Sequence, residues 1–255
     1  MSSPATYLVT GANRGIGKGF IQALLQRPNS TVIAAVRDIA KATPILNELP
    51  KATSSKLIII KLDFSIESDP KDAIAKLQSG HNITSLDVVI ANAGIAHSGT
   101  KVVDSSADAI RDHFNINTIG PVLLFQAVKP LLQASKTGNP IFLAISTGLG
   151  SLAAQEALSA FPYPYGPYGV SKAALNYLVR RIHIEETWLT AYVTHPGLVK
   201  TDMAPFLNDP SIDVASLGGA IEVEESVEGI LKTLGKANRE IGGTFQNYDG
   251  SIFPW

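Results

Sequence analysis

The sequence predicts an α/β fold: a single domain over residues 1–255, with a doubly wound, Rossmann-type parallel sheet of about seven strands and helices on both faces. Short β-favouring apolar runs alternate along the chain with segments of helical periodicity, which is typical of a parallel sheet. Several of these runs end on Gly, Asn, Ser or Asp, where an open parallel sheet binds its ligands. No linker, composition shift or internal repeat divides the chain.

The composition narrows the possible functions. Of the 255 residues, 45% are apolar and 17% charged, which supports a large core and argues against disorder. A net charge of −1 without a basic run argues against nucleic acid, and no apolar stretch approaches membrane-spanning length. The chain has no cysteine, and its five histidines lack metal-ligand spacing. We therefore expect a cytoplasmic protein with no metal and no nucleic-acid or membrane partner.

The first strand, residues 5–10, stops at a glycine-rich turn, and a helical pattern follows it up to Pro28. Strand, glycine turn and helix form the context of a dinucleotide site, because glycines let the backbone approach a pyrophosphate at the helix N-terminus. The spacing Gly-x-x-x-Gly-x-Gly is not the commoner fingerprint, so a plain strand-to-helix turn remains the alternative. The candidate cofactor residues of this turn are Gly11, Asn13, Arg14, Gly15, Ile16 and Gly17.

The second strand, residues 31–36, ends on Arg37, twenty residues beyond Gly17. An acidic residue near this point would bind the ribose hydroxyl of NAD, whereas a basic one accepts the extra phosphate of NADP. Arg37 and Arg14 both favour NADP(H). Asp38 is the alternative: if the end of the strand is placed one residue later, Asp38 could accept a hydrogen bond from the ribose hydroxyl of NAD.

The remaining elements follow the same alternation. We expect strands at 56–62, 86–91, 141–145, 189–194 and 244–247, and helices at 69–79, 107–116, 117–133, 168–184 and 222–234. The apolar positions of the 117–133 helix cover much of its circumference, which favours contact with a second subunit in a homodimer or homotetramer. The irregular segment 203–220 is expected to close over the site as a lid.

Tyr168 and Lys172 lie four residues apart in a segment of helical periodicity, so their side chains share one helix face. A phenol titrates near 10, and an adjacent ammonium would lower its pKa toward a useful range. The pair is a candidate acid/base, although a surface tyrosine beside a solvated lysine is the alternative interpretation.

Taken in order, these motifs resemble the classical short-chain dehydrogenase/reductase family over nearly the whole chain. Within that family the sequence is most similar to the fungal norsolorinic acid ketoreductase group and to sniffer-type carbonyl reductases. Arg37-Asp38, the segment from Ser171 to Tyr177 and the tail from Phe245 to Trp255 carry this finer resemblance.

The resemblance implies a role for each matching residue. Tyr168 would donate a proton to the carbonyl oxygen, Lys172 would lower the Tyr168 pKa and bind the nicotinamide ribose, and Asn117 would hold a water. The glycine turn would bind the pyrophosphate and Asp63 the adenine. The other implied cofactor residues are Asn92, Ala93, Gly94, Pro196, Gly197, Val199 and Thr201, the last two at the carboxamide.

The sequence departs from the family at the hydroxyl that orients the substrate. Ser146 and Thr147 precede Tyr168 by 22 and 21 residues, where the family has about a dozen. Strand alternation sends the two side chains to opposite faces, so only one is expected to act. The strand register favours Thr147 over Ser146.

The predicted function is an NADPH-dependent ketoreductase or carbonyl reductase acting on an apolar, aromatic or polyketide-like ketone. The alternatives are an NADP-dependent alcohol dehydrogenase working oxidatively and a non-catalytic NADP-sensing protein on the same fold. A sensor would be expected to lose Tyr168 or Lys172, and both are present. Five residues of the Pro-rich loop and the lid could line the pocket or pack within the lid, with neither role favoured: Phe161, Tyr163, Tyr165, Phe206 and Leu207.

Overall fold

The computed structural model describes residues 5–97, 99–159 and 165–255, and its centre is one seven-stranded parallel sheet. The strand order is β3-β2-β1-β4-β5-β6-β7, so the winding direction reverses between β1 and β4. The strands are β1 (Ala5–Thr10), β2 (Ser30–Val36), β3 (Lys56–Lys61), β4 (Val88–Ala91), β5 (Ile141–Ile145), β6 (Thr190–His195) and β7 (Phe245–Asn247). The predicted doubly wound sheet is confirmed, and a reversal of this kind creates a ligand-binding crevice at the carboxyl edge.

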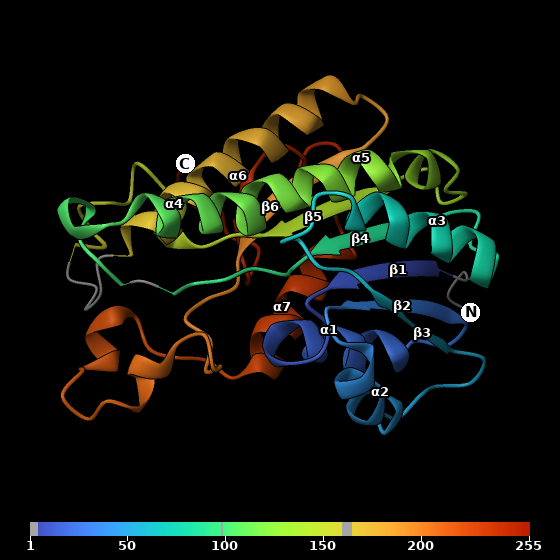
Figure 1. Cartoon of the computed structure of the whole chain (residues 1–255), viewed down its shortest axis with the longest axis horizontal. Coiled ribbons are helices and arrows are strands. Elements are labelled where there is room, and N and C mark those ends of the chain that lie inside the picture. Colours follow the sequence, from blue (N-terminus) through green and yellow to red (C-terminus); the bar gives the residue numbers. More distant parts are fainter. Residues whose placement is uncertain (1–4, 98, 160–164) are drawn as a thin grey trace.

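Helices cover both faces of the sheet (Figure 1). On one face, α3 (Asp69–His81), α5 (Gly120–Gln133) and α6 (Gly166–Glu185) bury a core that includes Leu77, Leu124 and Leu175. On the other, α1 (Gly15–Leu25), α2 (Ile39–Asn47) and α7 (Val223–Leu234) bury a second core that includes Phe20, Leu46 and Ile230. The strands between them are apolar on both sides, as a covered parallel sheet requires.

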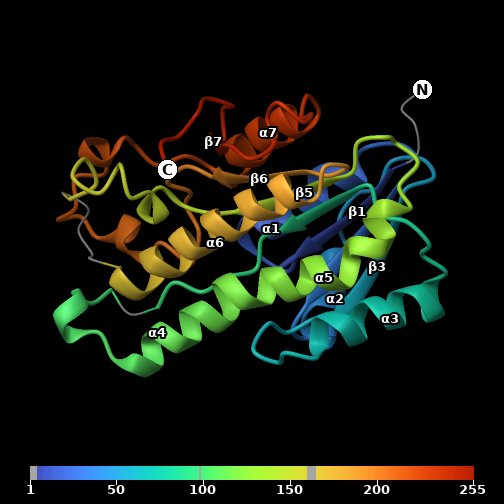
Figure 2. The same ribbon diagram turned by 90° about the horizontal axis from the view of Figure 1, so that it is seen from above.

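Two helical segments differ from the sequence expectation. The helix α2 was not predicted, because Pro44 interrupts its pattern; Asp38 begins it, accepting a hydrogen bond from the Lys41 amide at 3.1 Å. The expected helices at 107–116 and 117–133 form one rod, seen clearly from above in Figure 2. In this rod α4 (Ala107–Phe114) continues through a π-helical turn, η2 (Asn115–Ile119), into α5. Such π turns occur frequently at functional sites.

The connections at the carboxyl edge hold short 3₁₀ turns. These are η1 (Val102–Asp104), η3 (Gly148–Gly150), η4 (Pro205–Asn208) and η5 (Val214–Leu217), the last two within the predicted lid, orange at the lower left of Figure 1. The C-terminal tail crosses the β5–α6 loop, where the Ala153 amide donates to the Trp255 carbonyl at 2.8 Å. Across the described ranges, every helix is too short or too polar to cross a membrane.

Candidate active site

A cleft of about 570 Å³ opens at the carboxyl edge of the sheet, beside the reversal between β1 and β4. Its walls bring together residues that are far apart in the sequence: the glycine turn, the ends of β3, β4 and β5, and the start of α6. Of the predicted site residues, the cleft is lined by Gly11, Asn13, Arg14, Gly15, Ile16, Gly17, Arg37, Asp63, Asn92, Ala93, Gly94, Ser146, Tyr168, Lys172, Pro196 and Thr201.

The glycine turn forms a backbone cradle in which Gly11 and Gly17 leave no room for a Cβ. Gly11 has a φ of 64°, and a Cβ added to it would lie 2.9 Å from the Cα of Ala93. A Cβ on Gly17 would lie 2.1 Å from the Gly11 carbonyl oxygen. The helix α1 that follows begins at Gly15, and the preceding residue, Arg14, makes no side-chain hydrogen bond to its amides, so these first amides keep their hydrogen-bonding capacity. Close backbone approach and free amides at a helix N-terminus fit the pyrophosphate of a dinucleotide.

Thr10 and Asn92 tie the ends of β1 and β4 together beneath this cradle. The Thr10 hydroxyl accepts from the Asn92 and Ala93 amides at 3.0 and 2.9 Å. In return the Asn92 side-chain amide donates to the Thr10 carbonyl at 2.9 Å. These bonds fix the distance between the two strands at the point where the sheet reverses.

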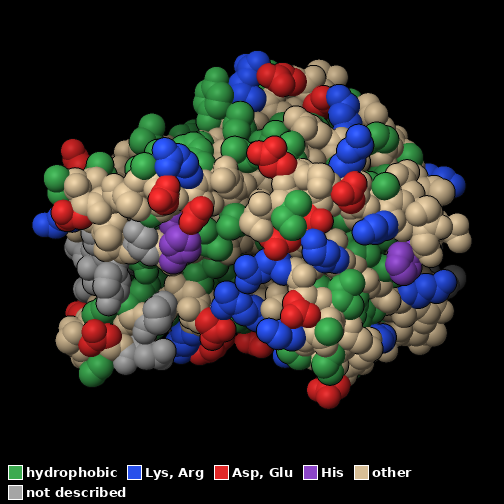
Figure 3. Space-filling view, in the orientation of Figure 1, with side chains coloured by type: hydrophobic (Ala, Val, Ile, Leu, Met, Phe, Trp, Pro, Cys, Tyr) green, Lys and Arg blue, Asp and Glu red, His purple; other side chains and the backbone are tan. Residues whose placement is uncertain are grey.

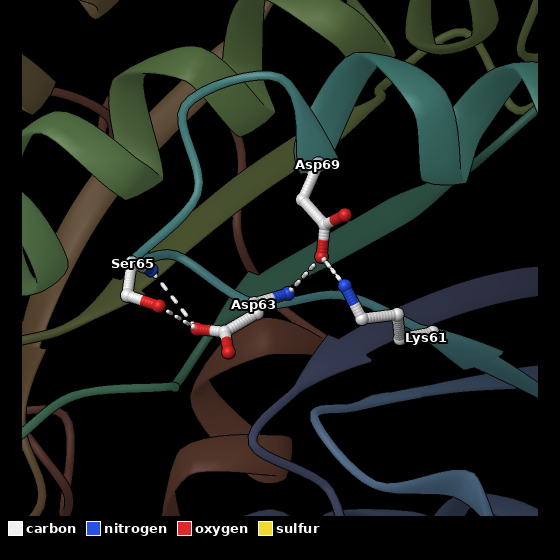
Figure 4. Close-up of polar contacts among 4 residues, drawn as sticks. All are labelled: Lys61, Asp63, Ser65 and Asp69. Atoms are coloured by element: carbon white, nitrogen blue, oxygen red, sulfur yellow. Dashed lines mark hydrogen bonds and ion pairs between the residues drawn. The ribbon is translucent and has the colours of Figure 1, made fainter.

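Asp63 is held in place by its neighbours (Figure 4). Its carboxylate accepts from the Ser65 amide and hydroxyl at 2.9 and 2.8 Å. Its backbone amide donates to Asp69, which also pairs with Lys61 at 2.6 Å. Burial opposes ionisation, but the Ser65 hydrogen bonds and the cations Arg37 and Lys61 outweigh it and hold the pKa of Asp63 below its usual value. Asp63 is therefore a fixed anionic acceptor at the wall of the cleft.

Arg37 and Asp38 differ in how the structure uses them. Arg37 is exposed, lines the cleft, and within the described residues makes no hydrogen bond or ion pair. Asp38 is committed to capping α2 and pairs with Lys41 at 3.7 Å. Arg14, the other basic residue of the prediction, pairs with Asp202 at 3.1 Å across the cleft mouth. Figure 3 shows Lys and Arg side chains gathered in the middle of this face, near α1.

Tyr168 and Lys172 share one face of α6, and the Lys172 Nζ lies 6.0 Å from the centre of the Tyr168 ring. The ammonium is buried and donates to the Ile145 carbonyl at 2.7 Å. Burial lowers the pKa of Lys172 to about 8. Burial also raises the pKa of Tyr168 above its usual value, against an opposing hydrogen bond with the Thr147 side chain.

Burial sets the direction of both pKa shifts, and the expected effect of Lys172 on Tyr168 stays a prediction. The sequence suggested that Lys172 lowers the pKa of Tyr168, but burial disfavours the charged form of both groups. With a pKa of about 8, Lys172 is still mostly protonated at neutral pH, so an ammonium stands beside the phenol. Tyr168 keeps its proton at neutral pH, which is the state that a proton donor needs.

The two candidate hydroxyls point to different partners. The Ser146 hydroxyl donates to the side-chain oxygen of Asn176 at 2.5 Å, and Ser146 also lines the cleft. The Thr147 side chain lies close enough to Tyr168 to lower the pKa of the phenol, and its hydroxyl accepts from the Leu149 amide at 3.3 Å. The structure therefore brings Thr147, and not the Ser146 hydroxyl, to the phenol of Tyr168.

Asn117 lies within the π-helical turn and is fully buried. Its side chain accepts from the Ile95 amide at 2.8 Å and donates to the Ile95 carbonyl at 2.9 Å, which holds the loop after β4 against α6. It also donates to the Ser171 hydroxyl at 3.0 Å. The π turn presents the amide to this loop, and a Cβ on Gly94 would lie 3.0 Å from the Asn117 oxygen and 3.6 Å from the Lys172 Nζ.

The segment after β6 completes the far wall. Pro196 and Thr201 line the cleft, while Val199 is buried and pairs with Ile221 in a β-bridge. Gly197 adopts a φ of 84°. Asn117, Thr147, Gly197 and Val199 are the predicted site residues that do not line the cleft.

Three of the five residues that could line the pocket or pack within the lid are described by the structure. Phe161 and Tyr163 lie outside the described residues. Tyr165 and Phe206 are buried and Leu207 half-buried, and none of these three lines the cleft.

Three histidines near the site were missed by the sequence reasoning, since no spacing marks them. His195 accepts a hydrogen bond from the Gly148 amide at 3.2 Å, next to Thr147. His97 lines the cleft, and its ring lies 4.5 Å from that of the buried His113.

Comparison with known proteins agrees with this geometry. The family model for short chain dehydrogenases matches residues 5–211. A norsolorinic acid ketoreductase from Dothistroma septosporum is 42% identical, over 100% of this chain and 94% of its own length. A second one from Emericella nidulans is 40% identical, over 98% and 93%. The crystal structure of an NADPH-bound carbonyl reductase from chicken fatty liver is 30% identical with a TM-score of 0.85, and the match covers 100% of both chains.

Proposed function

The chain belongs to the short chain dehydrogenase family, as the motifs indicated, and we propose that it is an NADPH-dependent ketoreductase. The observation that carries this proposal is the meeting of Thr147, Tyr168 and Lys172 beside the cradle of the glycine turn. A protonated phenol, a hydroxyl in contact with it and a buried ammonium form the set that carbonyl reduction requires.

NADP(H) is the proposed cofactor. The free amides at the start of α1 would hold its pyrophosphate, and Asp63 would bind the adenine. Arg37 supports the phosphate-bearing cofactor, because its guanidinium is exposed at the cleft while Asp38 is occupied with α2. The similar carbonyl reductase from chicken fatty liver, whose crystal structure carries NADPH, lends further support.

The proposed mechanism assigns one task to each residue of the site. When bound, NADPH supplies a hydride to the carbonyl carbon. Tyr168 gives its proton to the carbonyl oxygen, and Thr147 donates a hydrogen bond to that oxygen as negative charge develops there. The Lys172 ammonium then stabilises the phenolate left on Tyr168. Asn117 holds the β4 loop and α6 in register, and we propose that it also supports a water that relays a proton to Lys172.

The proposed substrate is an aromatic or polyketide-like ketone, and the names of the fungal relatives support this choice. The test is an NADPH-oxidation screen across aromatic ketones, diketones and quinones, with NADH alongside and Tyr168→Phe as the control. Turnover in the wild type that the variant loses would support the assignment. Oxidation of alcohols with NADP⁺ and no ketone reduction would favour the dehydrogenase alternative, and NADPH binding without any turnover would favour a sensor.

A further inference from the structure

His113 lies on α4 with its side chain fully buried. Its Nδ1 is 2.7 Å from the carbonyl oxygen of Ala109, one turn earlier on the same helix. A carbonyl oxygen only accepts hydrogen bonds, so Nδ1 carries the proton. In the neutral ring the other nitrogen, Nε2, is then an acceptor with an available lone pair.

The ring stays neutral at physiological pH. Burial, the largest influence, lowers the pKa of His113 below its usual value; the hydrogen bond with Ala109 opposes the shift, and the nearby His97 adds to it. Asp112 and the backbone of His97 oppose it more weakly. A neutral imidazole with a fixed tautomer presents one defined acceptor.

That acceptor is unused. The Nε2 of His113 is buried and has no hydrogen-bond partner within the described part of the chain. Buried polar atoms are nearly always paired, because an unpaired one loses its hydrogen bond with water and gains none. An exception close to a reaction centre requires an explanation, and a catalytic or binding role is one of those known for such groups.

The ring of His113 lies close to two side chains of the candidate active site. Its centre lies 6.3 Å from that of Tyr168 and 4.5 Å from that of His97. His97 is exposed and lines the cleft, whereas His113 does not line it and is reached from the cleft past the ring of His97 that it contacts. A group that passes His97 would reach His113 while a carbonyl is held at Tyr168.

We propose that the Nε2 of His113 is a specificity subsite that accepts a hydrogen bond from a hydroxyl on the ketone substrate, after His97 turns aside. This inference rests on the proposed ketoreductase function and narrows its substrates to ketones that carry a hydroxyl, such as phenolic ketones. A methoxy group at the same place has no proton to give and leaves Nε2 unpaired. The site therefore discriminates against the ether.

The experiment measures binding, so that it does not depend on turnover. Isothermal titration calorimetry with NADP⁺ present compares 3′-hydroxyacetophenone with 3′-methoxyacetophenone for the wild type, His113→Phe and His97→Ala. We expect the wild type to bind the hydroxy ketone about tenfold more tightly, the fold-change of one net hydrogen bond. His113→Phe, which keeps the ring shape without the acceptor, should bind both with similar Kd. His97→Ala should keep the preference, since it removes only the cover.

The outcomes separate this inference from the proposed function. Equal Kd values for the wild type, no binding of either ketone, or a preference that survives His113→Phe would each overturn the subsite. The wild-type comparison decides the matter even where His113→Phe fails to fold. Rates of NADPH oxidation with the same ketones are recorded separately. Preferential binding without turnover would refute the ketoreductase function and support the subsite. Turnover without preferential binding would support the ketoreductase function and refute the subsite.

Discussion

Replacing Thr147 by valine tests which hydroxyl orients the carbonyl. Valine keeps the branched shape of threonine at a position that is 9% exposed, so packing changes little. The change removes the hydroxyl that lowers the pKa of Tyr168, together with the 3.3 Å hydrogen bond that it accepts from the Leu149 amide. Loss of one oxyanion donor typically costs about 2–4 kcal/mol of transition-state stabilisation, or roughly 30- to 1000-fold in kcat/KM. Thr147→Ser keeps the donor and should keep most of the activity.

Ser146→Ala is the matched control from the neighbouring position. Its hydroxyl donates to Asn176 in a fully buried pair, so alanine leaves the Asn176 oxygen unpaired. We expect this variant to lose about 1–3 kcal/mol of unfolding free energy while kcat of the folded enzyme changes little.

Steady-state kinetics with one reducible ketone, together with urea unfolding of each variant, measure both quantities. The reasoning is refuted if Ser146→Ala loses activity a hundredfold or more while Thr147→Val stays near the wild type. If both variants are active, Tyr168 acts without a partner hydroxyl from β5. Ser151, the next hydroxyl along the loop, would be tested then, although its own oxygen already accepts from the Ala154 amide at 3.0 Å.

Four further changes test other parts of the structure. Tyr168→Phe should lower kcat by about 10²–10⁴ and leave NADPH binding intact, measured by turnover and fluorescence titration, because it removes only the proton donor; a fully active variant would end this assignment. Arg37→Asp should shift the kcat/KM ratio from NADPH toward NADH, because the new carboxylate repels the extra phosphate; an unchanged ratio would mean that Arg37 does not read the cofactor. Burial lowers the pKa of His195 from 6.5 to about 4. The folded state therefore binds fewer protons than the unfolded chain in this range, and the free energy of unfolding should fall as the pH falls from about 6.5 to 4. The expected loss of unfolding free energy is on the order of 3 kcal/mol and is measured by urea unfolding at several pH values. His195→Asn can still accept from the Gly148 amide but cannot titrate, so its stability should depend less on pH. An equally steep pH profile in this variant would exclude His195 as the source. The buried Tyr192 hydroxyl has no hydrogen-bond partner in the described ranges, so Tyr192→Phe should raise the unfolding free energy by about 1 kcal/mol. A clear loss of stability would show that the hydroxyl makes a hydrogen bond in the folded protein.

The features that depend on neighbouring residues were predictable from the sequence. The alternation of apolar runs predicted the strands and most helices, because the periodicity of a strand or a helix can be recognised within a few consecutive residues. The glycine turn and the Tyr168–Lys172 spacing were readable for the same reason, since each lies within one turn or one helix. Strand ends could be placed at one edge because parallel strands share their direction. Helix α2 was missed, since Pro44 within it obscures its periodicity.

What the tertiary structure decided depends on groups that meet across the fold. Only the packing of β5 against α6 sends the Ser146 hydroxyl to Asn176 and brings Thr147 to Tyr168. Only burial fixes the directions of the Tyr168 and Lys172 pKa shifts, because desolvation depends on the complete surroundings of a group. His113 gives no signal in the sequence, since an unpaired nitrogen is defined by every atom around it. Local sequence specified the elements and motifs, and long-range packing specified which atoms in them are free to react.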